Sequence, residues 1–199
     1  DTNNICIGSE AGDTLQSGID NTIIGTNCDS EGTGTNRAIG LGKGITAVQD
    51  YFTVGNGTDD IRNSHGSTTW STVSDKRFKK NIETSTAGLD FIDDLRPVTY
   101  NWKTKGEIPN WSKAYQEGSE EQYRNSKHNH GFIAQEVKEA IDNHPEIKDG
   151  FDMWYELEGS GGQQEVGETA LIPILVKAVQ ELSSEIKNIK KTCKCMKEE

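Results

Sequence analysis

The sequence predicts a repetitive β stem followed by a small α+β domain that ends in a long helix. Short apolar runs closed by glycine recur through residues 1–55, and mixed helix and strand patterns fill residues 74–190. A heptad pattern runs along about residues 169–191. We expect residues 56–73, which have loop composition, to be a linker or stem end and residues 192–199 to be a polar tail.

The stem is predicted from four similar runs, which close at Gly8, Gly25, Gly40 and Gly55 and step by 17, 15 and 15 residues. Apolar residues alternate within each run, which places them on one face of a strand. Glycine then permits the turn that follows. Short strands at a small period are typical of solenoids and fibrous β structures. We expect an intertwined trimeric β stem (a trimeric β-helix), with a single-chain β-solenoid as the alternative.

Composition narrows the classes of protein. Apolar residues make up 32% of the chain and the mean hydropathy is -0.74, so one large globular core is not expected. The net charge of -11 argues against nucleic acid as a partner, because binding to phosphate backbones relies on cations. No apolar run approaches membrane-spanning length, so no membrane partner is expected either.

The cysteines are too sparse for a disulfide framework. Cys6 and Cys28 lie in the repeat region, and Cys193-x-Cys195 lacks the second half of a zinc site. We expect free thiols and no metal site; metal binding or an inter-chain disulfide at the tail is the alternative.

The second part alternates between helix and strand patterns. Leu89 to Leu95 has helical periodicity and is stopped by Pro97. Residues 103–129 are polar and are expected to be an insertion or long loop. The other expected elements are strands at 98–102, 130–134 and 153–157 and a helix at 135–143, and a flexible turn at 159–162 leads to residues 164–166.

The last helix carries apolar residues in steps of 3, 4, 3, 4 and 3. This spacing is that of the a and d positions of a coiled coil. The alternative is an amphipathic helix that packs on its own domain. The predicted seam, through which we expect a trimeric coiled coil, consists of Ile172, Leu175, Val179, Leu182, Ile186 and Ile189.

A serine and a lysine stand at the start of the second part. A serine hydroxyl needs a base to become a nucleophile, and a neutral lysine can serve as that base. Burial, or a cation such as Arg77 or Lys80 nearby, would lower the pKa of a lysine at position 79. The spacing of Ser74 and Lys79 is by itself a weak signal, and Lys80 is a rival base.

The surrounding residues are more specific. Ser74-Asp75-x-Arg77-x-Lys79-x-Asn81-Ile82 resembles the start of the intramolecular chaperone domain of phage endosialidases, tailspikes and tail fibres, the self-cleaving peptidase S74 family. The resemblance continues, in the same order, in residues 95–102, 131–137 and 171–182.

The resemblance implies a domain that trimerises, helps the preceding stem to fold, and then releases itself by cutting the chain. Carried onto this sequence, Ser74 is the nucleophile and Lys79 the base, and the cut falls at Ser74–Asp75, with Val73–Ser74 as the alternative bond. Asp75, Arg77 and Asn81 match the motif in supporting roles. The rival hypothesis is a catalytically silent trimerisation module.

The resemblance also implies partners and a location. We expect a homotrimer, assembled with upstream fibre domains of the same chain and made in the host cytoplasm. The stem becomes part of the virion, and the chaperone domain is released after cleavage. No cofactor is expected, and a host receptor or glycan is expected only through upstream domains.

Overall fold

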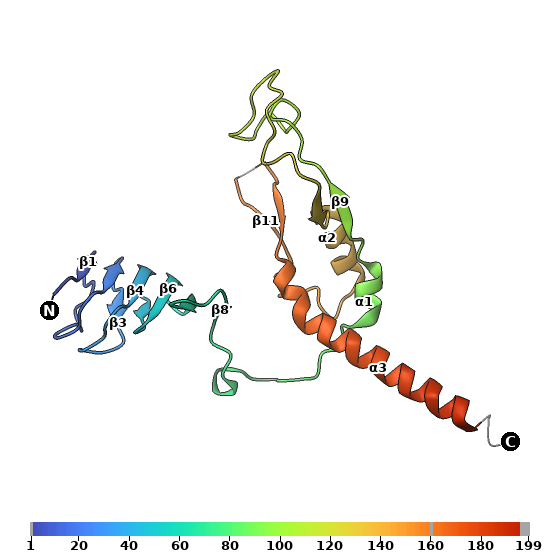
Figure 1. Ribbon diagram of the computed structural model, residues 1–199, viewed down its shortest axis with the longest axis horizontal. Helices are drawn as coiled ribbons and strands as arrows, with labels where there is room; N and C mark the ends of the chain where they lie inside the picture. Colours follow the sequence, from blue (N-terminus) through green and yellow to red (C-terminus); the bar gives the residue numbers. More distant parts are fainter. Residues whose placement is uncertain (1, 160, 196–199) are drawn as a thin grey trace. The chain divides into compact units, whose positions relative to one another are not determined.

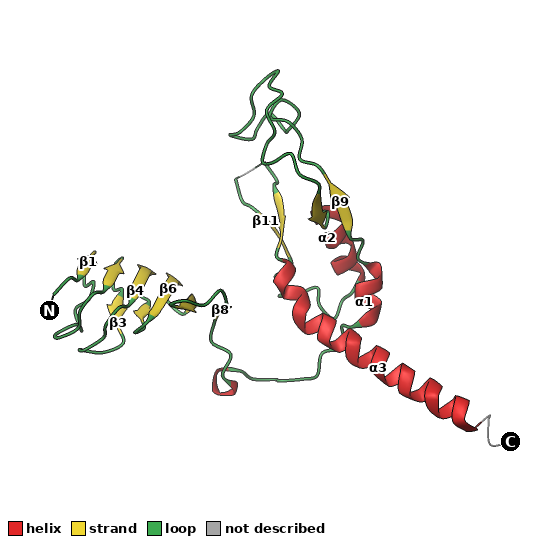
Figure 2. Ribbon diagram, in the orientation of Figure 1, coloured by secondary structure: helices red, strands yellow, loops and turns green. Residues whose placement is uncertain are grey.

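The computed structural model describes residues 2–159 and 161–195, with side chains up to residue 193. The chain divides into two compact units, Asp1–Ile82 and Glu83–Glu199. Strands form the first unit, whereas the second combines three α-helices with short strand pairs (Figures 1 and 2).

The first unit is a β-solenoid. Its rungs are β1 (Ile5–Ile7), β2 (Thr22–Ile24), β4 (Ile39–Lys43) and β6 (Tyr51–Asn56), and each strand pairs in parallel with the next. A second small parallel sheet joins β3 (Asp29–Ser30) to β5 (Thr46–Ala47). Both edges of β2 and of β4 are occupied by strands of the same chain. The structure therefore shows the solenoid and corrects the expectation of chains intertwined within one sheet.

The register of the rungs shows that the predicted closing glycine of the third rung is wrong. Gly42, and not Gly40, aligns with Gly25 and Gly55, so successive rungs are offset by 17, 17 and 13 residues. Gly40 instead points into the solenoid, where an added Cβ would lie 2.8 Å from the Cβ of Ala47. The sequence therefore uses this glycine to leave space inside the rung rather than to close it.

One corner of each rung is formed by a polar residue in the left-handed conformation. Asn3, Asp20, Arg37 and Asp50 have φ between 53 and 63° and recur with the rung spacing. Their side chains connect neighbouring rungs: Asn3 Nδ2 donates to Asp20 Oδ1 at 3.0 Å, and Arg37 Nε donates to Asp50 Oδ1 at 2.7 Å. The corners are thus held by polar contacts between rungs.

The interior of the solenoid is filled by small side chains. The buried cluster consists of Ile23, Cys28, Ala38, Ile45 and Ala47. Asn21 is also buried, and its amide is satisfied: Nδ2 donates to the Thr35 carbonyl at 2.7 Å, and Oδ1 accepts from the Ala38 N–H at 2.9 Å. A buried amide with its partners in place is compatible with stability.

Residues 56–73, which we expected to be a linker or stem end from their loop composition, contain two strands at the end of the large sheet. β7 (Asp59–Ser64) pairs antiparallel with β6, and β8 (Trp70–Ser71) pairs with β7. The Trp70 ring packs edge-on against Phe52, with centroids 5.6 Å apart. The last parallel rung is therefore covered by an antiparallel hairpin, which removes a free strand edge at that position.

The second unit packs three helices around one core. Its elements are α1 (Leu89–Asp94), β9 (Val98–Tyr100), β10 (Asn129–Gly131), α2 (Ala134–Asn143), β11 (Trp154–Glu156), β12 (Gln164–Val166) and α3 (Leu171–Cys195), with 3₁₀ turn η2 (Glu168–Ala170) before α3. β9 pairs antiparallel with β10, and β11 with β12. The buried core residues are Ala87, Phe91, Val137, Ala140, Ile141, Ile147, Met153, Leu171 and Ile174. Residues 103–128 contain no described helix or strand, as expected, and a bridge joins Thr104 to Gln122.

Helix α3 extends four residues beyond its predicted end at 191, and residues 196–199 of the predicted tail lie outside the described residues. Leu171, Ile174 and Ala178 are buried along one side of the helix. Glu181 Oε2 accepts a hydrogen bond of 2.8 Å from the N–H of Leu89, at the first turn of α1. This contact satisfies one of the free N–H groups of the α1 terminus and docks α3 against α1.

His144 should make the stability of this unit depend on pH. Its Nε2 lies 2.9 Å from Asp94 Oδ2, and its Nδ1 lies 3.0 Å from Glu146 Oε1. Desolvation lowers the pKa of His144, but the two carboxylates outweigh it and the net shift is upward. The protonated ring therefore stabilises the fold fully below the unfolded pKa of about 6.5, and this stability is lost as the pH rises through the folded pKa.

As the pH rises from below about 6.5 through the folded pKa of His144, we expect the thermal unfolding temperature of the second unit to fall in the wild type. The same rise in pH should lower the unfolding temperature of His144→Gln by less. Unfolding followed by circular dichroism at several pH values measures the difference. Parallel pH profiles for the two proteins would contradict the assignment.

Candidate active site

A short turn after the stem brings the predicted serine and lysine together. The 3₁₀ turn η1 (Lys76–Phe78) is capped by Asp75, whose Oδ1 accepts from the N–H of Arg77 at 2.8 Å. The Arg77 guanidinium also pairs with this carboxylate at 2.6 Å and, with the backbone hydrogen bond, lowers the pKa of Asp75. The turn returns the chain on itself, so residue 79 can reach residue 74.

The central contact of the site is a hydrogen bond between the two predicted catalytic side chains. Lys79 Nζ donates to Ser74 Oγ at 2.8 Å. Of the two adjacent lysines, Lys79 makes this contact and Lys80 does not. Both Ser74 and Lys79 are exposed to solvent. The geometry suits proton transfer from the hydroxyl, which requires the lysine in its neutral form.

The remaining motif residues, Arg77 and Asn81, shape the backbone and the charge around the serine and lysine. Arg77 is paired with Asp75, so its charge is engaged within the motif. Asn81 has φ of 52°, a left-handed conformation that asparagine tolerates better than most residues. Apolar side chains flank the site in the open, including Val73, Phe78 (78% exposed) and Ile82.

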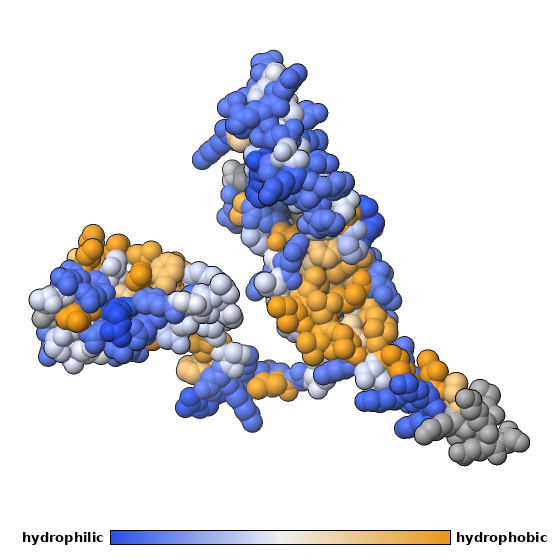
Figure 3. All heavy atoms as spheres, in the orientation of Figure 1, coloured by the Kyte–Doolittle hydropathy of each residue, from blue (hydrophilic) through white to orange (hydrophobic). Residues whose placement is uncertain are grey.

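The predicted helical seam lies on a different side of α3 from the residues that pack into the core. All six of its side chains are exposed, from 41% for Leu182 to 64% for Val179. The helix does pack on its own domain, as the alternative expected, but through Leu171, Ile174 and Ala178 and not through the six seam residues. Figure 3 shows the resulting apolar surface over the first half of α3.

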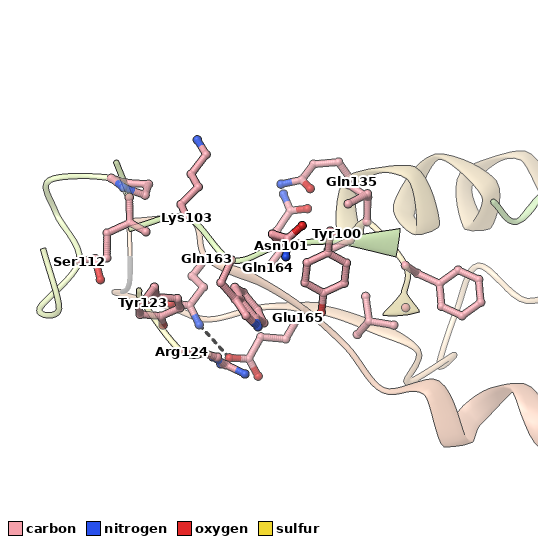
Figure 4. Close-up of a pocket in the computed structure, with 18 of the residues that line it drawn as sticks. Tyr100, Asn101, Lys103, Ser112, Tyr123, Arg124, Gln135, Gln163, Gln164 and Glu165 are labelled. Carbon is pink, nitrogen blue, oxygen red and sulfur yellow. Dashed lines mark hydrogen bonds between the residues drawn. The ribbon is translucent and has the colours of Figure 1, made fainter. Parts of the chain in front are cut away.

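A second feature, which the sequence analysis missed, is an aromatic cleft of about 690 Å³ in the second unit (Figure 4). The loop after β9 supplies Trp102, which meets Tyr123 edge-on at 5.7 Å and lies beneath the Arg124 guanidinium at 4.6 Å. Residues of β12 and Gln163, which precedes it, also line the cleft, and Gln163 Nε2 donates to Glu165 Oε1 at 2.8 Å. The aromatic residues of the polar insertion were the available signal. Aromatic and amide lining suits binding more than proton transfer.

Other kinds of site are sparse in the described part of the chain. It contains no group of three or more side chains placed to hold a metal ion. Cys6, Cys28 and Cys193 are free thiols there, whereas the side chain of Cys195 lies outside the described residues. Among the described helices, none has the length and apolar character needed to cross a membrane.

A serine nucleophile with a lysine partner is a known variant of the serine–histidine arrangement in peptidases. Residues 74–144 match the model of the Peptidase_S74 family, described as chaperone of endosialidase. The matched segment begins at Ser74, and the match confirms the resemblance and supports a chaperone role. No curated protein and no solved structure matches the chain.

The structure also joins the sequence blocks that carry this resemblance. The second and third blocks meet where β9 pairs with β10 and where Arg96 forms an ion pair with Glu136. The fourth block, residues 171–182, lies beyond the matched segment and forms the first half of α3.

Proposed function

We propose that this chain is part of a phage-type tail fibre or tailspike. In this proposal the region that begins at Ser74 is an intramolecular chaperone, which trimerises, assists folding of the solenoid and releases itself by autoproteolysis. The stem then stays in the virion fibre, and any receptor or glycan is bound by upstream domains. The observation that carries the proposal is the 2.8 Å contact between Lys79 Nζ and Ser74 Oγ at the first residue of the family match.

The cleavage chemistry needs only these side chains and water. Neutral Lys79 takes the proton of a Ser74 hydroxyl as Oγ attacks a peptide carbonyl carbon. The C–N bond breaks, and the lysine returns the proton to the leaving amine, which gives an ester on Oγ. Water then hydrolyses the ester and restores the hydroxyl. No cofactor takes part in these steps.

Which peptide bond is cut depends on whether the attacking serine belongs to the same chain or to a sister chain of the trimer. If Ser74 attacks its own carbonyl, which breaks Ser74–Asp75, the intermediate is a strained four-membered ring. Attack on the Val73 carbonyl closes a five-membered ring and breaks Val73–Ser74 instead. A hydroxyl from a sister chain has neither restriction. Cleavage at Ser74–Asp75, the bond that we propose, is therefore favoured within a trimer.

Exposure of the site supports a link between assembly and cleavage. Ser74 and Lys79 are open to water, whereas burial of a basic side chain is what favours the neutral form that this chemistry needs. Covering the site with a sister copy would exclude that water. Cleavage would then follow trimerisation, so that the stem loses its chaperone only after it has assembled.

Intact mass spectrometry of the purified chain tests this function. We expect two fragments that meet at Ser74 and Asp75, and a native mass of three chains before cleavage. A stable, uncut trimer would favour the silent trimerisation module, and fragments that meet at Val73 and Ser74 would favour attack within one chain.

The proposed trimer contact gives a separate prediction. Val179 is the most exposed residue of the seam, at 64%, and a lysine there would place three ammonium groups at one level of a coiled coil. We expect Val179→Lys to convert the native mass from trimer to monomer. Gln180→Lys, which adds the same charge at the adjacent exposed position, should stay trimeric. A trimeric Val179→Lys protein would exclude this seam as the contact.

A further inference from the structure

Most of the bulky aliphatic residues of the solenoid's large sheet lie on its outer side, with Ile23 as the inward exception. The alternation seen in the sequence places the central residue of each rung inward, and these residues are Cys6, Ile23, Gly40 and Thr53. The residues on either side of them form two outward columns in register across five strands. One column is Ile5, Thr22, Ile39, Phe52 and Asn63; the other is Ile7, Ile24, Leu41, Val54 and Ile61.

These two columns, which we term the outer face, are uncharged; Ile5, Ile7 and Ile61 are exposed, and the other seven residues are half-buried. Ile5 is 51% exposed, Ile7 59% and Ile61 45%. Residues 1–73 include nine Asp and Glu side chains, and none stands in either column. Figure 3 shows apolar residues gathered along one edge of this unit. Apart from Ile23 and Ile45, the solenoid buries only a cysteine and alanines as apolar residues. Its core is therefore small, and the gain from folding a single copy is limited because it scales with the apolar area buried.

We propose that the outer face packs against the same face of other copies of this chain, so that three solenoids lie side by side around one axis. This inference rests on the proposed trimer and names the surface through which the stems meet. It replaces the intertwined stem with one in which each copy keeps its own hydrogen-bonded sheet and contributes one apolar face.

The size of the outer face identifies the occupant. Five strands about 4.8 Å apart and two columns of side chains cover roughly 300 Å², whereas a stable interface buries about 800 Å² on each partner. The face is therefore too small to hold an independent partner. A sister copy is different, because a shared C-terminal contact raises its local concentration to about the millimolar range. A weak but continuous apolar surface then suffices.

The absence of charge in the columns also suits a copy of the same chain. Each copy has a net charge of -11, so identical surfaces repel wherever carboxylates face one another. The outer face offers a path along all rungs on which two copies can touch without that repulsion. Copies held at equal height by one helix contact would meet rung against rung, with aliphatic residues opposite aliphatic residues.

Site-directed photo-cross-linking on the full chain tests the proposal. A benzoylphenylalanine is introduced at Leu41, on the outer face, and in a control at Thr46, an exposed residue of the small second sheet. The Ser74→Ala background keeps the chain whole. Native mass spectrometry first establishes the oligomeric state, and the cross-linked peptides are then identified by using a mixture of light and isotope-labelled chains.

In a trimeric preparation we expect mixed light–heavy products from position 41, joined to residues of the outer face, and none above background from position 46. A trimer that gives no inter-chain product at 41, or a product confined to one chain, overturns the outer-face contact but leaves the proposed trimer intact. A monomeric chain at micromolar concentration overturns both.

Discussion

Replacement of Ser74 by alanine should leave the chain uncut under conditions in which the wild type is fully cleaved. The substitution removes the hydroxyl to which Lys79 Nζ donates at 2.8 Å. Loss of a nucleophile that acts with its base as one unit lowers rates by about 10³-fold or more. Intact mass measured over time gives the cleaved fraction directly. Because Ser74 is exposed, its removal should change stability by no more than about 0.5 kcal/mol.

Lysine variants separate the base from a simple hydrogen-bond donor. Lys79→Arg keeps a cation that can donate to Ser74 Oγ, but a guanidinium does not lose its proton in proteins. We therefore expect Lys79→Arg to be as inactive as Ser74→Ala. Lys80→Arg, the matched change at the neighbouring lysine, should cleave at nearly the wild-type rate.

Two outcomes would contradict this assignment. Fragments of unchanged mass from Ser74→Ala would show that another nucleophile, or a contaminating peptidase, makes the cut. Cleavage by Lys79→Arg together with an inactive Lys80→Arg would transfer the role of base to Lys80. Circular dichroism of each variant verifies that the two units remain folded.

The stem shows how far alternation in a sequence can predict a fold. The four runs correctly predicted four strands, because the alternation of apolar residues is a local property. The register of these strands, in contrast, depends on contacts between residues of different rungs. Gly40 and Gly42 both follow an apolar residue, and only the packing of Gly40 against Ala47 and Cys28 decides which one closes the rung. The pattern also did not reveal that most of the aliphatic residues of these runs face outward, whereas Ile23 faces the core.

The sequence predicted the serine–lysine pair, the aromatic cleft and the surface of α3 to different degrees. The positions of Ser74 and Lys79 followed from the family resemblance, and the turn that joins them depends on nearby residues such as Asp75. The aromatic cleft was not predictable, because its walls come from segments far apart in the chain and meet only when β9 and β12 are in place. The heptad pattern located the seam but not the second apolar side of α3, which lies at Leu171, Ile174 and Ala178.

Gly42→Ala should unfold the solenoid locally and cost more than any exposed substitution. Gly42 has φ of 147°, a region essentially restricted to glycine, and an added Cβ would lie 1.9 Å from the carbonyl oxygen of Gly55 on the next rung. The backbone strain alone costs about 1–3 kcal/mol. Relief of the clash requires β4 and β6 to separate, which breaks their parallel pairing. We expect a total loss of at least about 3 kcal/mol.

Hydrogen exchange resolved by peptide is the suitable measurement, because the effect is confined to neighbouring rungs. Amides of β4 and β6 should lose most of their protection in Gly42→Ala, while peptides from α1 and α2 keep theirs. Gly32→Ala is the matched control, since that glycine has nothing within 4 Å of an added Cβ and no left-handed φ. If Gly42→Ala were as well protected as Gly32→Ala, the stacking of Gly42 on Gly55 would be wrong. The rung offsets of 17, 17 and 13 residues, and the outer columns that depend on them, would then have to be reassigned.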